Sequence, residues 1–313
     1  MKKIFAILLT LALVFSLAAC GAKDDNTTTA TETTTEEVVT EEASTTEATE
    51  PSTDESKPEG KAAEESSTEA EESTEEETEK EKAPSTKEEI VAAYAAVMNQ
   101  AKKDAPGFKK VEWQTLPDDA NSRIVAQGES VVNTALNLAG NNFMTTKEKS
   151  TSNPEIKDKG NDMSIFPISN SDYGCLLKDA SAVKTATCTV LPNGNYKIKI
   201  VLKDEKNPEP IKNKTDKVAP SNHGSVFSPV SKKDIDDTLN GGIVSAVAKD
   251  ITYSLTYHDC SSTIEFNPKD NKLVSLEQFT KVTISGSGRI AFITLDVTKQ
   301  ELVDEMHITD FKY

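Results

Sequence analysis

The spacing of apolar residues changes along this chain, and each kind of spacing predicts a different element. In the segment after residue 86, four apolar side chains recur at helical spacing: Ile90, Tyr94, Val97 and Met98. They predict a first helix with one apolar face, which begins near Lys87 and ends before Pro106-Gly107. Both Ser85 and Thr86 precede a glutamate at capping-box spacing, so either residue could cap this helix. A weaker pattern of the same period predicts a second helix at about residues 129–143.

The period then changes to the alternation that is typical of a strand with one buried face. Four apolar residues alternate with lysines and other side chains: Tyr196, Ile198, Ile200 and Leu202. The Asn193-Gly194 pair in front of them predicts a hairpin with the preceding strand, which ends near Val190. The segment 145–162 is polar and is expected to be an exposed loop or strand edge. After the strand at residues 196–202, a short helix that Ser231 caps is expected to end at Gly241.

From Ile251 to the C-terminus the alternation predicts an antiparallel meander of long strands. Gly286 and Gly288 fall inside an apolar run, where glycine usually marks a bulge or a bend. Helices at the front and strands at the back are typical of an α+β domain. We therefore expect residues 87–313 to form a single domain, in which N-terminal helices cover one side of a curved antiparallel sheet.

Residues 21–86 contain no Phe, Trp, Tyr, Leu, Ile, Met or Cys and consist mostly of Thr, Glu, Ser and Ala. Such a segment cannot bury enough apolar surface to fold, so it is predicted to be a disordered tether. It carries 22 acidic residues and 5 lysines, which accounts for the net charge of −17, while residues 87–313 are almost neutral. Nucleic-acid binding needs a basic surface and is not expected.

The first 19 residues have the organisation of a signal peptide. Lys2 and Lys3 precede an apolar run of about 14 residues, which is shorter than the ~20 residues of a membrane-spanning helix. The run ends in Leu17-Ala18-Ala19-Cys20, which resembles the lipobox of bacterial lipoproteins. This resemblance implies a diacylglyceryl group on the Cys20 sulfur and cleavage before Cys20, and so a domain anchored at the outer face of the cytoplasmic membrane, toward or beyond the cell wall. An ordinary signal peptide cut after Ala19 is the alternative.

The order of the expected elements resembles a group of uncharacterised lipid-anchored surface proteins of clostridia-like Gram-positive bacteria. The similarity rests on three motifs: Pro106-Gly107-Phe108, Ala186-Thr187-Cys188 before the hairpin, and the turn from Asn267 to Leu273. It implies no known activity. The outline is also similar to the half-barrel of bacterial lipoprotein and glycolipid carriers, but an architecture alone does not transfer a function.

Few residues suggest catalysis or metal binding. His223 lies between Ser221 and Ser225 in a polar loop, where we expect a solvated histidine. His258 and Cys260 would share one face of a strand, with His307 as a third ligand only if its strand pairs alongside, and a structural zinc site needs four ligands. No known catalytic motif is present. We therefore expect neither an enzyme nor a metal or other cofactor.

Three cysteines remain once Cys20 is lipidated, so one intramolecular disulfide at most can form. The choice lies among Cys175–Cys188, Cys188–Cys260 and no disulfide, and we favour Cys175–Cys188. Trp113 could be a stacking platform for a sugar, but at a helix-to-sheet junction it is more often part of the core. Oligomeric state cannot be read from these patterns.

Two functional classes remain, a binding module for a lipid or another apolar envelope ligand and a structural or interaction domain. The expected ligand groove lies between the first helix and the meander, and its lining would comprise Tyr94, Met98, Tyr253, Leu255 and Tyr257, with Ile293 and Leu295 nearby. A carrier needs a cavity of several hundred Å³. In a structural domain the same residues would close into a core.

Overall fold

A computed structural model describes residues 82–241, 245 and 248–313. The predicted signal peptide, the predicted lipidation site Cys20 and nearly all of the predicted tether lie outside these residues. Within the described part of the chain, no helix has both the length and the apolar character that a membrane span requires.

The described residues contain both helices and strands, and a nine-stranded sheet dominates the fold. The helices are α2 (Lys87–Asp104), α3 (Glu129–Phe143), α4 (Lys147–Ser152) and α5 (Lys232–Leu239), with short 3-10 turns at Ala180–Ala182 and His223–Ser225. The strands are β1 (Gly107–Thr115), β2 (Arg123–Gln127), β3 (Glu155–Lys157), β4 (Val183–Val190), β5 (Tyr196–Leu202), β6 (Glu205–Lys206), β7 (Ala248–Asn267), β8 (Lys272–Ile290) and β9 (Ile293–Lys312).

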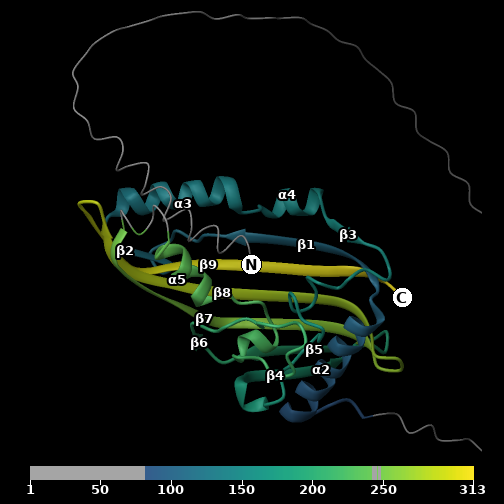
Figure 1. The fold of residues 1–313 in the computed structure, drawn as a ribbon. Helices are drawn as coiled ribbons and strands as arrows, with labels where there is room; N and C mark the ends of the chain where they lie inside the picture. The colour runs from purple at the N-terminus through teal and green to yellow at the C-terminus, as the bar shows by residue number, and fades with distance from the viewer. Residues whose placement is uncertain (1–81, 242–244, 246–247) are drawn as a thin grey trace, which may run out of the picture. The chain divides into compact units, whose positions relative to one another are not determined.

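The sheet order is β3-β1-β9-β8-β7-β5-β4, with β2 also paired to β9 and β6 to β7. Every pair is antiparallel. The predicted C-terminal meander is confirmed as β7, β8 and β9, three long strands that run side by side through the middle of the sheet (Figure 1). The hairpin at Asn193-Gly194 joins β4 to β5, and Gly194 has the positive φ of 82° that the turn requires.

Local sequence explains where the helices begin and end. Thr86, and not Ser85, caps α2: its hydroxyl accepts from the Glu89 backbone N–H, and the Glu89 carboxylate accepts from the Thr86 N–H. The helix ends before Pro106, with Ala105 in the left-handed region at φ 46°. Ser231 caps α5 in the same way, by accepting from the Asp234 N–H.

The choice of cap can be tested by two alanine substitutions. Thr86→Ala should lower the free energy of unfolding by about 1 kcal/mol, because the Glu89 N–H loses its acceptor. Ser85→Ala is the matched control, since the Ser85 hydroxyl meets only the exposed Glu89 carboxylate. Urea denaturation of a soluble chain that begins at Gly21 would measure both. Equal effects of the two substitutions would contradict the assignment of Thr86 as the cap.

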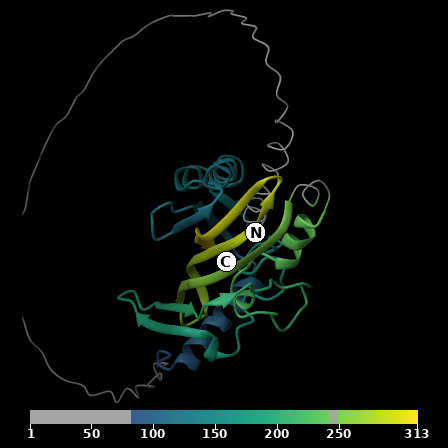
Figure 2. The same ribbon diagram turned by 90° about the vertical axis from the view of Figure 1, so that its left-hand side faces the viewer.

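The prediction that N-terminal helices cover one side of the sheet is not confirmed. Only α2 packs its whole apolar stripe into the core, against β4, β5 and β8. Helix α3 lies beside β2, and Figure 1 places α3 and α5 toward the β8–β9 hairpin and α2 toward the β7–β8 turn. Irregular segments supply much of the remaining cover, including the buried Phe166, Leu177 and Phe227. Two views at right angles show that α3 and α5 lie on different sides of the β8–β9 hairpin (Figure 2).

Two stretches differ from their sequence-based interpretation. Residues 107–115 form β1, which no alternating pattern had indicated, because β1 lies between β3 and β9 and is only partly buried along its middle. The segment predicted as a loop or strand edge contains a short helix, α4, and the three-residue edge strand β3. The Thr146 side chain caps α4 by accepting from the Lys149 N–H.

Candidate apolar binding pocket

The predicted groove between the first helix and the meander is closed. Tyr94 and Met98 on α2 are fully buried, and so are Leu255 and Tyr257 on β7, all within one hydrophobic core. The Tyr94 hydroxyl lies 2.7 Å from Ser262 Oγ, and the Val230 backbone N–H donates to the Tyr257 hydroxyl at 3.0 Å. These four residues therefore belong to the core, and the predicted groove between α2 and β7 does not exist, although Tyr257 also borders a second hollow described below.

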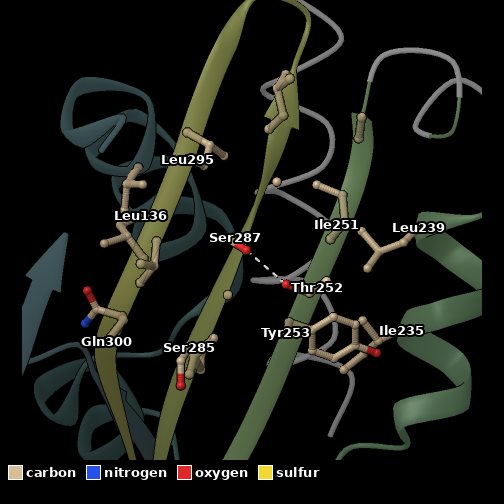
Figure 3. A pocket seen from close by; sticks show the side chains of 17 residues that line it. Leu136, Ile235, Leu239, Ile251, Thr252, Tyr253, Ser285, Ser287, Leu295 and Gln300 are labelled. Atoms are coloured by element: carbon tan, nitrogen blue, oxygen red, sulfur yellow. Dashed lines mark hydrogen bonds between the residues drawn. The ribbon is translucent and has the colours of Figure 1, made fainter. Parts of the chain in front are cut away.

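A hollow exists instead at the other end of the long strands, near the β8–β9 hairpin. Helix α3 contributes Val132 and Leu136, and α5 contributes Ile235 and Leu239. The strands contribute Ile251 and Tyr253 from β7, Ile284, Gly286, Gly288 and Ile290 from β8, and Leu295 and Val297 from β9. Figure 3 shows the α5 side chains and Tyr253 on one side of β8, with Leu136 and Leu295 on the other. Of the predicted groove residues, only Tyr253 lies here, together with Leu295.

Two glycines of β8, Gly286 and Gly288, line this pocket. A Cβ at Gly286 would lie 2.7 Å from the Thr252 carbonyl oxygen, and a Cβ at Gly288 would clash with Ile251 Cδ1. Strand β7 therefore approaches β8 more closely here than side chains would allow. The predicted irregularity is confirmed as a bulge in the β8–β9 pairing between Ile284 and Gly286.

Tyr253 holds α5 against the sheet and so forms one wall of the pocket. Its hydroxyl lies 2.7 Å from Asp236 Oδ1 and 3.1 Å from the Lys232 carbonyl oxygen, both on α5. The Lys232 Nζ lies 4.7 Å from the centroid of the Tyr253 ring. Burial and the neighbouring Asp236 carboxylate raise the pKa of Tyr253 above its usual range, so the phenol stays protonated and can donate to Asp236.

The pocket has a cavity volume of about 100 Å³ and an almost wholly apolar lining. Many of its apolar side chains keep part of their surface exposed, among them Leu136, Leu239, Ile251, Tyr253 and Ile284. The volume falls below the several hundred Å³ expected of a carrier that encloses its ligand. An apolar cavity of this size suits a small apolar group, while the partly exposed rim leaves room for the rest of a longer molecule.

The three histidines do not form the arrangements considered from the sequence. His223 is fully buried and not solvated, because Glu205 on β6 accepts from the His223 N–H and lies 2.8 Å from its Nδ1. Ser225 donates to the Asn222 carbonyl, so it forms no pair with His223. The interpretation of His223 as a solvated loop residue was wrong, since its partner Glu205 comes from a strand that the sequence pattern did not reveal.

His258 and Cys260 do not share a face, because the β7–β8 pairing shifts between His258 and Ser261 and Asp259 adopts a positive φ of 52°. The His258 Nε2 lies 3.0 Å from Thr283 Oγ1, while Cys260 is buried. Among the described residues, no group of three or more His, Cys, Asp or Glu side chains is placed to hold a metal ion.

Trp113 is buried in β1 and stacks on His307, with ring centroids 5.0 Å apart. It therefore belongs to the core, and an exposed sugar platform at this position is excluded.

The predicted Cys175–Cys188 disulfide is not present, because Cys175, Cys188 and Cys260 are all free thiols. Cys175 lies buried on a segment that the Asn99 side chain of α2 binds, whereas Cys188 is partly exposed on β4. Burial raises the pKa of the Cys175 and Cys260 thiols to about 12, so these two side chains behave as protonated core residues.

A second hollow, of about 470 Å³, lies beside the middle of the sheet and has a mixed polar and apolar lining that includes Lys110, Glu112, Phe227, Gln278, Asp304 and Met306. Lys110 and Glu112 form an ion pair at 2.7 Å, and Gln114 Nε2 donates to Asp304 Oδ2 at 2.6 Å. Burial and the nearby Glu112 carboxylate raise the pKa of Asp304 to about 6. This hollow has no continuous apolar surface, so it differs in kind from the pocket between α3 and α5.

Comparisons of this chain with protein-family models, with curated proteins and with solved structures gave no match.

Proposed function

We propose that this chain is a lipoprotein that is anchored through Cys20 at the outer face of the cytoplasmic membrane and binds an apolar ligand without catalysing a reaction. The ligand site is the pocket between α3, α5 and the glycine-bearing part of β8. The lipobox-like sequence at Leu17–Cys20 supports the anchor. The described residues support the binding site.

The observation that carries this proposal is a set of partly exposed apolar side chains gathered around one hollow. A folded chain normally closes such residues into its core, as α2 does at the opposite end of the sheet. Each Å² of apolar surface that a ligand removes from water stabilises the complex by roughly 25 cal/mol. With almost no polar group in the lining, the pocket can select a ligand by apolar character and shape, but it cannot position one for chemistry.

The volume of the pocket limits what it can hold. About 100 Å³ accommodates a short stretch of an acyl chain or a small apolar group, and the polar remainder of the ligand would stay at the rim. A lipid or an apolar envelope precursor of the membrane fits this description. A structural domain that binds no such ligand is the alternative, and the closed core around Tyr94 and Met98 is the observation in its favour.

The binding site can be tested by filling it. Leu136→Trp places a larger side chain in the pocket and should weaken the binding of a fluorescent fatty acid at least about tenfold, because the two apolar groups compete for one small volume. Leu138→Trp on the same helix is the matched control, since Leu138 is 36% exposed and does not line the pocket. Titration of the soluble chain from Gly21 would measure both affinities.

Saturable binding that only Leu136→Trp abolishes, with the thermal unfolding midpoint unchanged, would support the proposal. If wild type shows no saturable binding, the structural alternative holds. If both variants bind as wild type does, the pocket is not the ligand site.

A further inference from the structure

The most exposed apolar side chain among the described residues is at the tip of the β8–β9 hairpin. Phe292 is fully exposed, and the neighbouring Ile293 is 42% exposed. With Ile290 and Ala291 they form four consecutive apolar residues across a two-residue turn. An isolated exposed apolar residue is ordinary, but a run of them at the apex of a hairpin of two long strands is not.

The turn also departs from the chemistry that turns usually require. Ala291 adopts a positive φ of 51°, a conformation that glycine or asparagine reaches at lower cost. The other two hairpins of this sheet follow the rule, with Asn193-Gly194 between β4 and β5 and Asn271 at positive φ between β7 and β8. The unusual turn residue is therefore confined to the β8–β9 hairpin, at the same end of β8 as the pocket.

The hairpin tip is continuous with the lining of the pocket. Ile290 forms a small core cluster with Val132 of α3 and Leu295 of β9, and all three line the hollow. Figure 3 shows Leu295 close to the end of the strands, above Leu136. Any surface that contacts Phe292 would therefore also lie beside the partly exposed apolar rim of the pocket.

The charged side chains nearest the tip are two of each sign, Lys249 and Arg289 against Asp250 and Asp296. Lys249 of β7 pairs with Arg289 of β8, and the next pair toward the hairpin tip is Ala248 with Ile290. Arg289 pairs with Asp250 at 2.5 Å, while Lys249 is exposed and forms no ion pair within the described residues. One unpaired lysine near an anionic membrane surface contributes about 1 kcal/mol to binding.

We propose that the β8–β9 hairpin inserts Phe292 and Ile293 into the interface of the phospholipid bilayer. An aromatic side chain beside an aliphatic one and a lysine is the combination that this interface accommodates. A disordered chain of 66 residues, the length predicted for the tether after Cys20, has a relaxed span of ~45 Å, which would bring the bilayer within reach. This contact would also place the rim of the pocket against acyl chains, and that part rests on the proposed function.

The contact can be measured on the full-length protein reconstituted into vesicles of phosphatidylglycerol and phosphatidylcholine. Phe292→Trp adds a fluorescent reporter at the tip, with wild type, whose only tryptophan is the buried Trp113, as the background. Val218→Trp is the matched control, because Val218 is 71% exposed on a segment away from the hairpin. We expect brominated lipid to quench Phe292→Trp about threefold more strongly than Val218→Trp.

Equal quenching at the two positions would overturn the proposal. Emission from Phe292→Trp that is already shifted to the blue in lipid-free detergent solution and depends on protein concentration would overturn it too, in favour of contact with a second copy of the chain.

A second measurement connects the tip to the pocket. Phe292→Asp should slow the transfer of a fluorescent fatty acid from vesicles to the full-length protein about tenfold, while its affinity for the same fatty acid in solution stays unchanged. An unchanged transfer rate would contradict the tip as the membrane contact. Quenching at Phe292 does not depend on fatty-acid binding, so a failure of the proposed function would appear in the titration alone.

Discussion

Cys20→Ala is expected to remove almost all of the protein from the membrane fraction of cells, or to leave it as an unprocessed precursor. The sulfur of Cys20 is the atom that would receive the diacylglyceryl group. Each CH₂ group buried in the bilayer contributes roughly 0.8 kcal/mol to membrane binding, so two acyl chains anchor the protein stably. A protein without acyl chains lacks this anchor. Labelling of cells with a clickable fatty acid, followed by fractionation, would measure both effects.

Cys188→Ala is the control for this experiment, because Cys188 is a partly exposed free thiol in β4. It should leave labelling and membrane association as in wild type. Fatty-acid incorporation into Cys20→Ala equal to that of wild type would contradict the anchor, and so would loss of label from Cys188→Ala.

Asp304→Asn is expected to raise the free energy of unfolding by about 1–3 kcal/mol above pH 6.5, because burial and Glu112 raise the pKa of Asp304 from 3.8 to about 6. Below about pH 3 the carboxyl is protonated in both folded and unfolded chains, and the charge has no effect on stability. As the pH rises from about 4 to about 6, the unfolded chain loses this proton first, so ionisation of Asp304 progressively lowers wild-type stability. Asparagine removes this loss and can still accept from Gln114 Nε2.

Urea denaturation at pH 4 and at pH 7.5 would measure the difference. Asp310→Asn is the control, since Asp310 lies exposed on the same strand, has a positive φ that asparagine also tolerates, and should change stability little at either pH. A lower stability of Asp304→Asn at pH 7.5, or the same gain at both pH values, would show that the Asp304 carboxylate is not destabilised by its surroundings.

The helices and strands with a regular spacing of apolar residues could be predicted, because that spacing is a local property of the sequence. The helix at Lys87–Asp104, the strand after the Asn193-Gly194 hairpin and the long C-terminal strands have clear 3.6-residue or two-residue periods, and the helix at Glu129–Phe143 has a weaker one. Strand β1 was missed because its pairing partner β9 is almost two hundred residues away, and its half-buried residues do not alternate. No local pattern contains that information.

The candidate site was predicted less well than the fold, for a related reason. The sequence identified apolar faces on α2 and β7, but it did not show that irregular segments around Phe166 and Phe227 would close over them. The pocket instead combines α3, α5 and three strands, which only the register of the sheet brings together. The one local signal was the pair Gly286 and Gly288, which indicated an irregular strand without indicating what its neighbours would leave open.

The binding of an apolar ligand in this pocket can be tested most directly by native mass spectrometry. The soluble chain from Gly21 would be incubated with a lipid extract of bacterial membranes, together with the Leu136→Trp and Leu138→Trp variants. We expect one apolar adduct per chain on wild type and on Leu138→Trp, and none on Leu136→Trp. Wild type without an adduct, or an adduct that persists in Leu136→Trp, would contradict the pocket as the ligand site.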